Sequence, residues 1–158
     1  MNILSFDQAS VKTAWSFFTD LELCEYSLIH IKEKDKDKRF NLMCKEIQKI
    51  IQTKNPNLVV FEDVSLQTNV TTLTVLARLQ GCIISECLRL DIPFVIYKPT
   101  AWRKILNFQQ GRGVGRQELK KQALDYIEMN YDLVNRDLIN DDIAEAICIG
   151  SAYIKKNY

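Results

Sequence analysis

The 158-residue sequence contains few of the residues from which several common kinds of site are built. It has a single histidine, His30, and five cysteines with no CxxC pair, so it offers little for a zinc site or a disulfide framework. His30 is expected at an exposed or half-buried strand position. The cysteines are expected to be reduced and mostly buried: Cys24, Cys44, Cys82, Cys87 and Cys148.

Long apolar runs and glycine-rich loops are also missing. No apolar run approaches the ~18 residues of a membrane span, and no signal-peptide pattern precedes Asp7. No glycine-rich loop follows the first apolar run, which argues against a sheet-based nucleotide-binding domain. With 47% hydrophobic and 26% charged residues, the chain is predicted to be one globular domain over residues 1–158, cytoplasmic and without a membrane partner.

The net charge of +1 hides an uneven distribution. Residues 98–121 contain seven basic residues against one glutamate, a net charge of +6, which indicates a face for a polyanion such as DNA. In the mixed-charge run at residues 32–39 the opposite signs nearly cancel, and we predict a solvated turn there. The candidate DNA-binding residues are Lys98, Arg103, Lys104, Arg112, Arg116, Lys120 and Lys121.

The pattern of apolar residues predicts an α/β protein. A buried strand at residues 3–6 ends at Asp7, and residues 12–19 and 22–31 form two antiparallel strands joined by a tight turn. Helices are predicted at 40–51, 70–90, 117–129 and 140–156, with a short one at 100–106 capped by Thr100 and a glycine-rich loop at 107–115. Strands at 57–61 and 93–97 complete a mixed five-stranded sheet, a three-strand meander followed by two parallel strands, with helices on both faces.

Four carboxylates stand out against this framework. Asp7 and Glu62 end two strands that would emerge side by side if those strands are parallel neighbours, and Asp142 and Glu145 share one face of the last helix. Converging carboxylates repel one another unless cations lie between them, and two Mg²⁺ ions in such a site hydrolyse phosphodiesters. The pattern also permits simpler interpretations: Asp7 as a turn residue, Glu62 as a polar strand end, and Asp142 as the N-cap of a capping box. Asp141 would share a helix face with Glu145 as well.

The segments ILSFD at residues 3–7, VVFE at 59–62 and DIAEA at 142–146 resemble the RuvC family of Holliday-junction resolvases, which has an RNase H-like fold. That family has an Asp on strand one, a Glu ending strand four and an acidic pair on the final helix, in the same order over essentially the whole chain. The small bacteriophage-encoded members are the most similar.

The resemblance implies a homodimer, formed through the helix at residues 70–90, that nicks four-way DNA junctions symmetrically with two Mg²⁺ or Mn²⁺ ions per site. It implies that Asp142, rather than Asp141, is a ligand, and that Lys120 lies near the scissile phosphate. Arg103 or Lys104 matches another active-site lysine of the family. The implied catalytic and metal-binding set is Asp7, Glu62, Asp142 and Glu145, with Lys120 also catalytic.

The sequence departs from the family pattern at three places. Gln8-Ala9 follows Asp7 where the family usually has Pro-Gly, and Glu145 stands where many members have Asp or His. In the branch-point loop, Ser65 and Leu66 replace an aromatic residue that stacks on DNA and contributes ~1–3 kcal/mol. We therefore expect relaxed sequence selectivity and cleavage of forks and flaps as well as four-way junctions.

Two other functions remain open from the sequence. A ribonuclease H acting on RNA–DNA hybrids would use a glutamate on the helix after the third strand, where this chain has Glu46. A non-catalytic junction-binding protein would keep the fold and the basic face. The complete set of four carboxylates argues against a pure binder, because negative charge beside phosphate weakens binding.

Overall fold

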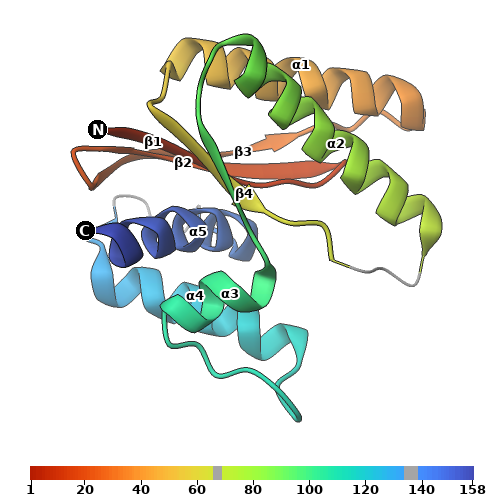
Figure 1. The fold of residues 1–158 in the computed structure, drawn as a ribbon. Helices are drawn as coiled ribbons and strands as arrows, with labels where there is room; N and C mark the ends of the chain where they lie inside the picture. Colours follow the sequence, from red (N-terminus) through yellow and green to blue (C-terminus); the bar gives the residue numbers. More distant parts are fainter. Residues whose placement is uncertain (66–68, 134–138) are drawn as a thin grey trace.

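A five-stranded mixed sheet forms the centre of the molecule in a computed structural model that describes residues 1–65, 69–133 and 139–158 (Figure 1). The strand order is β3-β2-β1-β4-β5, and β1–β2 and β2–β3 are antiparallel whereas β1–β4 and β4–β5 are parallel. This is the predicted meander followed by two parallel strands. The strands are β1 (Asn2–Asp7), β2 (Lys12–Thr19), β3 (Glu22–His30), β4 (Leu58–Glu62) and β5 (Phe94–Tyr97).

The turn between β2 and β3 has the conformation that a two-residue hairpin requires. Asp20 and Leu21 both have positive φ, 49° and 73°, which matches the twist of the flanking strands. The predicted hairpin is therefore confirmed. His30 is exposed at the end of β3, as expected.

Helices cover both faces of the sheet (Figure 1). One layer consists of α1 (Lys36–Lys54) and α2 (Val70–Arg89), and the other of α3 (Pro99–Ile105), α4 (Arg116–Asn130) and α5 (Asp141–Asn157). Alternate side chains of β1 enter two separate cores, because Ile3 packs with α5 and Leu4 packs with α1 and α2. No helix among the described residues is long and apolar enough to cross a membrane.

The last helix lies unusually close to the sheet. Ser5 Oγ donates a hydrogen bond to the Ala146 carbonyl oxygen at 2.8 Å. A Cβ atom at Gly150 would lie 2.3 Å from the Phe18 ring and 2.7 Å from Ser5 Oγ, so the approach requires glycine. This contact fixes the position of α5 relative to the end of β1.

The predicted cap of the short helix is wrong, and the last helix has a cap other than Asp142. The helix expected to begin at a Thr100 cap begins at Pro99 instead, after Lys98, which makes no side-chain capping bond. Proline suits a first helical position because its φ is already helical and it has no N–H to satisfy. In α5 the cap is Asn140, whose Oδ1 accepts from the Ile143 N–H at 2.9 Å, so the capping-box role considered for Asp142 is excluded.

The five cysteine thiols are free, as predicted. Cys87 and Cys148 are buried and Cys44 and Cys82 are half-buried, whereas Cys24 is exposed. The expectation of mostly buried thiols therefore fails at Cys24, which lies on β3, an edge strand of the sheet.

Candidate functional site

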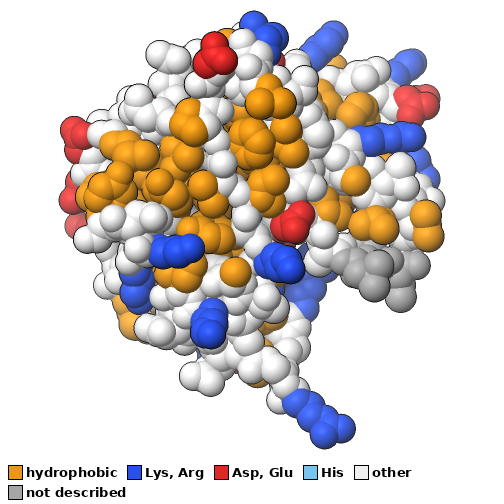
Figure 2. Space-filling view, viewed as in Figure 1, with side chains coloured by type: hydrophobic (Ala, Val, Ile, Leu, Met, Phe, Trp, Pro, Cys, Tyr) orange, Lys and Arg blue, Asp and Glu red, His pale blue; other side chains and the backbone are white. Residues whose placement is uncertain are grey.

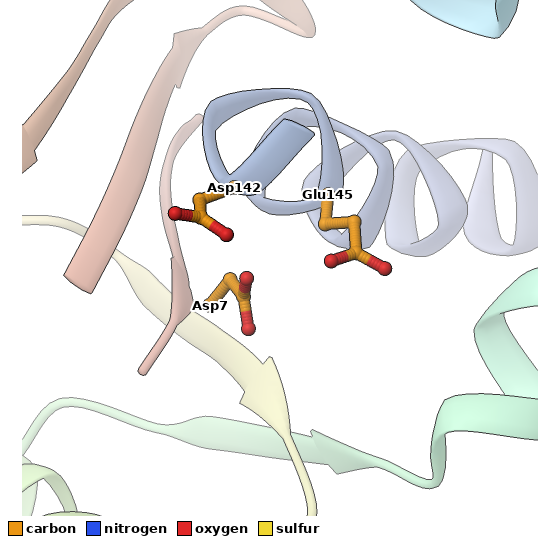
Figure 3. Close-up of side chains that lie close together, drawn as sticks. All are labelled: Asp7, Asp142 and Glu145. Carbon is orange, nitrogen blue, oxygen red and sulfur yellow. The ribbon is translucent and has the colours of Figure 1, made fainter. Parts of the chain in front are cut away.

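Three carboxylates converge at the end of β1. Asp7 is the last residue of β1, and Asp142 and Glu145 lie one turn apart at the start of α5, where they point toward Asp7 (Figure 3). One oxygen from each of the three lies within 4.8 Å of the others. Because Asn140 caps the helix, the Asp142 carboxylate is free to face this cluster instead of its own backbone.

Glu62 lies in the same cavity but is held slightly apart. The parallel register pairs Phe6 with Phe61, so Asp7 and Glu62 emerge side by side from β1 and β4, as predicted. The Glu62 carboxylate does not belong to the group of three. It accepts a hydrogen bond from Trp102 Nε1 at 2.6 Å, and Arg103 Nη2 lies 3.9 Å from it. The four predicted carboxylates thus share one cavity, with three close enough to share one cation.

Burial, together with repulsion between carboxylates, favours the neutral forms of Asp7, Glu62 and Glu145. Burial raises the pKa of Asp7 well above its usual value, and the charges of Glu145, Glu62 and Asp142 raise it further, against a lowering by Arg103. Burial also raises the pKa of Glu62 and of Glu145, although Trp102 and Arg103 act against it at Glu62 and Arg103 acts against it at Glu145. Such a cluster favours a bound cation.

The donor atoms fit a divalent cation of the hard class. Asp7, Asp142 and Glu145 offer only carboxylate oxygens, which Mg²⁺, Mn²⁺ and Ca²⁺ prefer, and neither histidine nor cysteine takes part. The site therefore has the chemistry to hold a divalent metal ion.

Two cations border the cluster. Arg103, with a side chain only 15% exposed, donates from Nη2 to Glu145 at 3.2 Å, whereas the neighbouring Lys104 is exposed and does not line the cavity around the cluster. Of the two basic residues left open by the sequence, Arg103 is therefore the one in the site. Lys120 forms an ion pair with Asp141.

The ion pair with Lys120 gives Asp141 different surroundings from the adjacent Asp142. Burial acts to raise the pKa of Asp141, but the hydrogen bond and charge of Lys120 outweigh it and lower the pKa. The same hydrogen bond raises the pKa of Lys120. Asp142 belongs to the acidic cluster with Asp7 and Glu145, and Asp141 does not.

A cavity of about 800 Å³ opens around the carboxylates. Of the predicted DNA-binding residues, Arg103 and Arg116 line it, and Lys98 lines a smaller hollow of about 430 Å³ beside it. Three others are exposed but line neither hollow: Lys104, Arg112 and Lys121. In the branch-point loop, Ser65 lines both hollows, and Leu66 lies outside the described residues.

Several residues that line the cavity or contact its carboxylates were not predicted from the sequence. Trp102 was not a candidate, because an aromatic residue in a short helix is usually a core residue. Only the fold brings its indole N–H to Glu62. Gln8 donates from Nε2 to the Glu62 carbonyl oxygen at 2.6 Å and so ties the ends of β1 and β4 together. Lys12, Lys36 and Arg39 also line the cavity, although the run at residues 32–39 was given no binding role.

The ribonuclease H alternative is not supported. Glu46, which would have to reach the cluster, is exposed on α1 and is absent from the residues that line the cavity. Glu62 occupies the place beside Asp7 instead.

The sheet order and the helices on both faces (Figure 1) define an RNase H-like fold, with an acidic cluster where the end of β1 meets the start of α5. The family model of the crossover junction endodeoxyribonuclease RuvC matches residues 5–152, and the chain belongs to this family. It is thus an endodeoxyribonuclease.

Relatives and solved structures agree with this assignment. The RuvC crossover junction endodeoxyribonucleases of two Nitratidesulfovibrio vulgaris strains, Hildenborough and DP4, are 24% identical over 131 residues, which cover 80% of this chain and 75% of theirs. Thermus thermophilus RuvC, in a complex with a Holliday junction substrate, has a TM-score of 0.74 at 9% identity, with 98% of this chain and 94% of that chain covered.

A viral structure shares the same fold. The fowlpox virus resolvase, in a complex with Holliday junction DNA, has a TM-score of 0.64 at 16% identity and covers 99% of this chain and 98% of its own. At such low identities these likenesses bear on the fold alone.

Proposed function

We propose that this endonuclease nicks Holliday junctions and other branched DNA by metal-dependent phosphodiester hydrolysis. The observation that carries the proposal is the convergence of Asp7, Asp142 and Glu145 at the C-terminal end of β1, inside a cavity that Arg103 and Arg116 also line. Hard oxygen ligands beside cations suit a site that binds phosphate and metal together. The Holliday junction DNA bound by the Thermus thermophilus and fowlpox virus proteins supports this substrate class.

In this proposal the carboxylates hold the metal. Asp7, Asp142 and Glu145 bind one ion, and Glu62, on the Trp102 side of the cavity, completes the set for a second. Two Mg²⁺ or Mn²⁺ ions, when bound, supply an activated water and stabilise the leaving oxygen. Bound cations would offset the repulsion from Glu145, Glu62 and Asp142 that adds to burial in raising the pKa of Asp7.

The basic residues bind the DNA backbone. Arg103 and Arg116 reach phosphates beside the cluster, because both line the cavity. Lys120 contacts the scissile phosphate from the Asp141 side, and its raised pKa keeps it charged. The exposed cations Lys98, Lys104, Arg112 and Lys121 contact more distant phosphates.

Relaxed selectivity is part of the proposal. Ser65, at the edge of the cavity, is small and has no ring to stack on an unpaired base at the branch point. Recognition then rests on backbone contacts, which carry no sequence information. Forks and flaps are therefore proposed as substrates beside four-way junctions.

A homodimer formed through α2 would allow two opposing nicks. Val70 and Leu88 on α2 are 73% and 65% exposed, and Gly81 has open space around it. Hydrophobic side chains gather on the surface over α2 and the adjacent edge of the sheet at β5 (Figure 2). An apolar helix face of this kind suits a two-fold contact.

The test is nicking of a synthetic four-way junction with Mg²⁺ or Mn²⁺. Wild-type protein should nick it, and Asp7→Asn and Glu62→Gln should lose cleavage by several orders of magnitude while binding the junction with wild-type affinity. Cleavage retained in both variants would contradict the assignment of these carboxylates. Binding without any cleavage by the wild type would support a non-catalytic junction-binding protein instead.

The substrate range is tested with forks, flaps and four-way junctions of several sequences in the same assay. Rates within about tenfold of one another are expected, because a lost stacking contact of ~1–3 kcal/mol leaves little discrimination. Activity confined to four-way junctions at one preferred sequence would refute the relaxed selectivity.

A further inference from the structure

Basic side chains line the main cavity on two sides of the acidic cluster. Arg103 and Arg116 belong to α3 and α4, in the helix layer that contains α5. Lys36 and Arg39 belong to the start of α1, in the layer on the opposite face of the sheet (Figure 1), and Lys12 begins β2. The carboxylates lie between the two helix layers, at the C-terminal ends of β1 and β4 and the start of α5.

The cations on the α1 side are available to a ligand. Lys12 and Lys36 are exposed, and no ion pair within the described part of the chain involves either of them. Lys36 and Arg39 are three residues apart and therefore share a face of α1. Arg39 donates from Nη1 to the Glu33 carbonyl oxygen at 3.0 Å, a neutral acceptor that leaves its charge uncompensated.

The acidic residues of this charged segment do not line the cavity. Asp35 caps α1 and accepts hydrogen bonds from the Asp37 and Lys38 N–H groups, and neither Asp35 nor Asp37 belongs to the cavity wall. The segment at residues 32–39 has mixed charge in sequence, yet it presents mainly positive charge to the cavity. Folding thus separates the two signs.

We infer that Lys12, Lys36 and Arg39 bind the phosphate backbone of DNA on the α1 side of the acidic cluster, opposite the backbone that Arg103 and Arg116 contact. The inference rests on the proposed function and extends it. A branch point directs the backbones of its strands apart, so a site that holds it needs cations on both sides of the cleavage position. A polyanion also approaches a carboxylate cluster more readily when cations flank it.

The experiment compares two double variants that remove the same charge. Lys12→Gln/Lys36→Gln removes two cations that line the cavity, and Lys34→Gln/Lys38→Gln removes two exposed cations of the same region that do not. Binding of a fork and a four-way junction is measured by fluorescence anisotropy over a series of salt concentrations, with Ca²⁺ in place of Mg²⁺. The nicking rate at saturating DNA is measured in parallel with Mg²⁺.

The cavity variant should lose about 1–2 from the slope of log K against log salt, because each lost duplex phosphate contact contributes ~0.9. The control variant should keep the wild-type slope. An equal loss of salt slope in both variants, or no loss in the cavity variant, would overturn the inference. If the wild type still nicks branched DNA in that case, the proposed function is unaffected. A wild type that neither binds nor nicks branched DNA would overturn both.

Discussion

Trp102 and Glu62 illustrate how single residues prepare the site. Trp102 is fully buried, packs edge-on against Phe108 with ring centroids 5.6 Å apart, and directs its indole N–H at Glu62 Oε2. The hydrogen bond fixes one oxygen of the carboxylate and lowers the pKa of Glu62, against the effect of burial. A charged acceptor makes such a bond worth ~1.5–3 kcal/mol.

Trp102→Phe should therefore slow junction nicking by about 10- to 100-fold, the rate equivalent of that free energy. Without the indole donor the pKa of Glu62 rises, so the acidic limb of the pH–rate profile should move to higher pH. Trp15→Phe is the matched control, because Trp15 is also nearly buried but packs in the other core. An unshifted pH profile in Trp102→Phe, with circular dichroism unchanged, would contradict the positioning role.

The acidic cluster also makes the stability of the metal-free protein depend on pH. The pKa values of Asp7, Glu62 and Glu145 are raised in the folded state, so the folded protein binds more protons than the unfolded chain above the ordinary carboxylate pKa. Stability should fall as the pH rises from that value through the raised pKa values. Divalent metal should restore it.

Thermal unfolding in EDTA across this pH range measures the effect. Asp7→Asn should raise the melting temperature of the metal-free protein at neutral pH, by about 2–4 °C per kcal/mol of relieved repulsion, and should reduce the gain on adding Mg²⁺. Asp125→Asn, on α4 and outside the cavity, serves as a control. A wild type that loses stability as the pH falls through this window would show that the cluster is not strained.

At the scale of elements, the site depends on how closely α5 approaches the sheet. The Ser5–Ala146 hydrogen bond and the absence of a side chain at Gly150 place the first two turns of α5, with Asp142 and Glu145, against the end of β1 (Figure 3). A strand and a helix far apart in sequence thereby share one cluster. The apolar pattern predicts the helix at residues 140–156 but not how closely Gly150 approaches Phe18, because that distance depends on packing between elements.

Gly150→Ala should destabilise the protein by ~1–3 kcal/mol, the usual cost of overpacking, despite the better helix propensity of alanine. Urea unfolding monitored by circular dichroism measures the change. Gly150→Ala should cost less stability when it is added to Phe18→Leu than when it is added to the wild type. The reason is that the nearest clash of the new Cβ atom is with the Phe18 ring, which Phe18→Leu removes. A Gly150→Ala protein as stable as the wild type would show that α5 can move away at little cost.

In the molecule as a whole, α2 has an apolar face that stays exposed to solvent in the isolated subunit. Val70 and Leu88 are largely exposed, and a Cβ atom at Gly81 would meet nothing within 4 Å among the described residues. A side chain at Gly81 therefore costs the isolated subunit nothing in packing. It would obstruct a second copy packed against the same helix.

Gly81→Glu should convert the proposed dimer into a folded monomer, observed as a fall in mass by half in sedimentation velocity. Buried charge at a two-fold contact meets its own copy, which adds repulsion to the steric obstruction. Met129→Glu is the control, since Met129 is 81% exposed on α4, away from α2. Dimers that persist in Gly81→Glu would place the interface elsewhere.

The sequence by itself determined the order of the elements and the carboxylates at their ends. Alternating and helical apolar patterns are local properties, and Asp7 and Glu62 follow continuous apolar strands. The crossover through α1 joins β3 to β4 and allows a parallel strand, but it does not by itself place β4 beside β1, so only the structure shows that Asp7 and Glu62 are neighbours. The Asp142–Glu145 spacing on α5 was equally local.

Only the tertiary structure decided which neighbouring side chains reach the site. Arg103 enters it and Lys104 does not, Asp141 turns to Lys120 while Asp142 turns to Asp7, and the choice depends on the rotation of each helix about its axis. That rotation is fixed by long-range contacts such as the one between Gly150 and Phe18. The same holds for the indole of Trp102, which contacts Glu62, and for the cations of α1, which line the cavity, because the residues they meet there lie on other elements, far away in the chain.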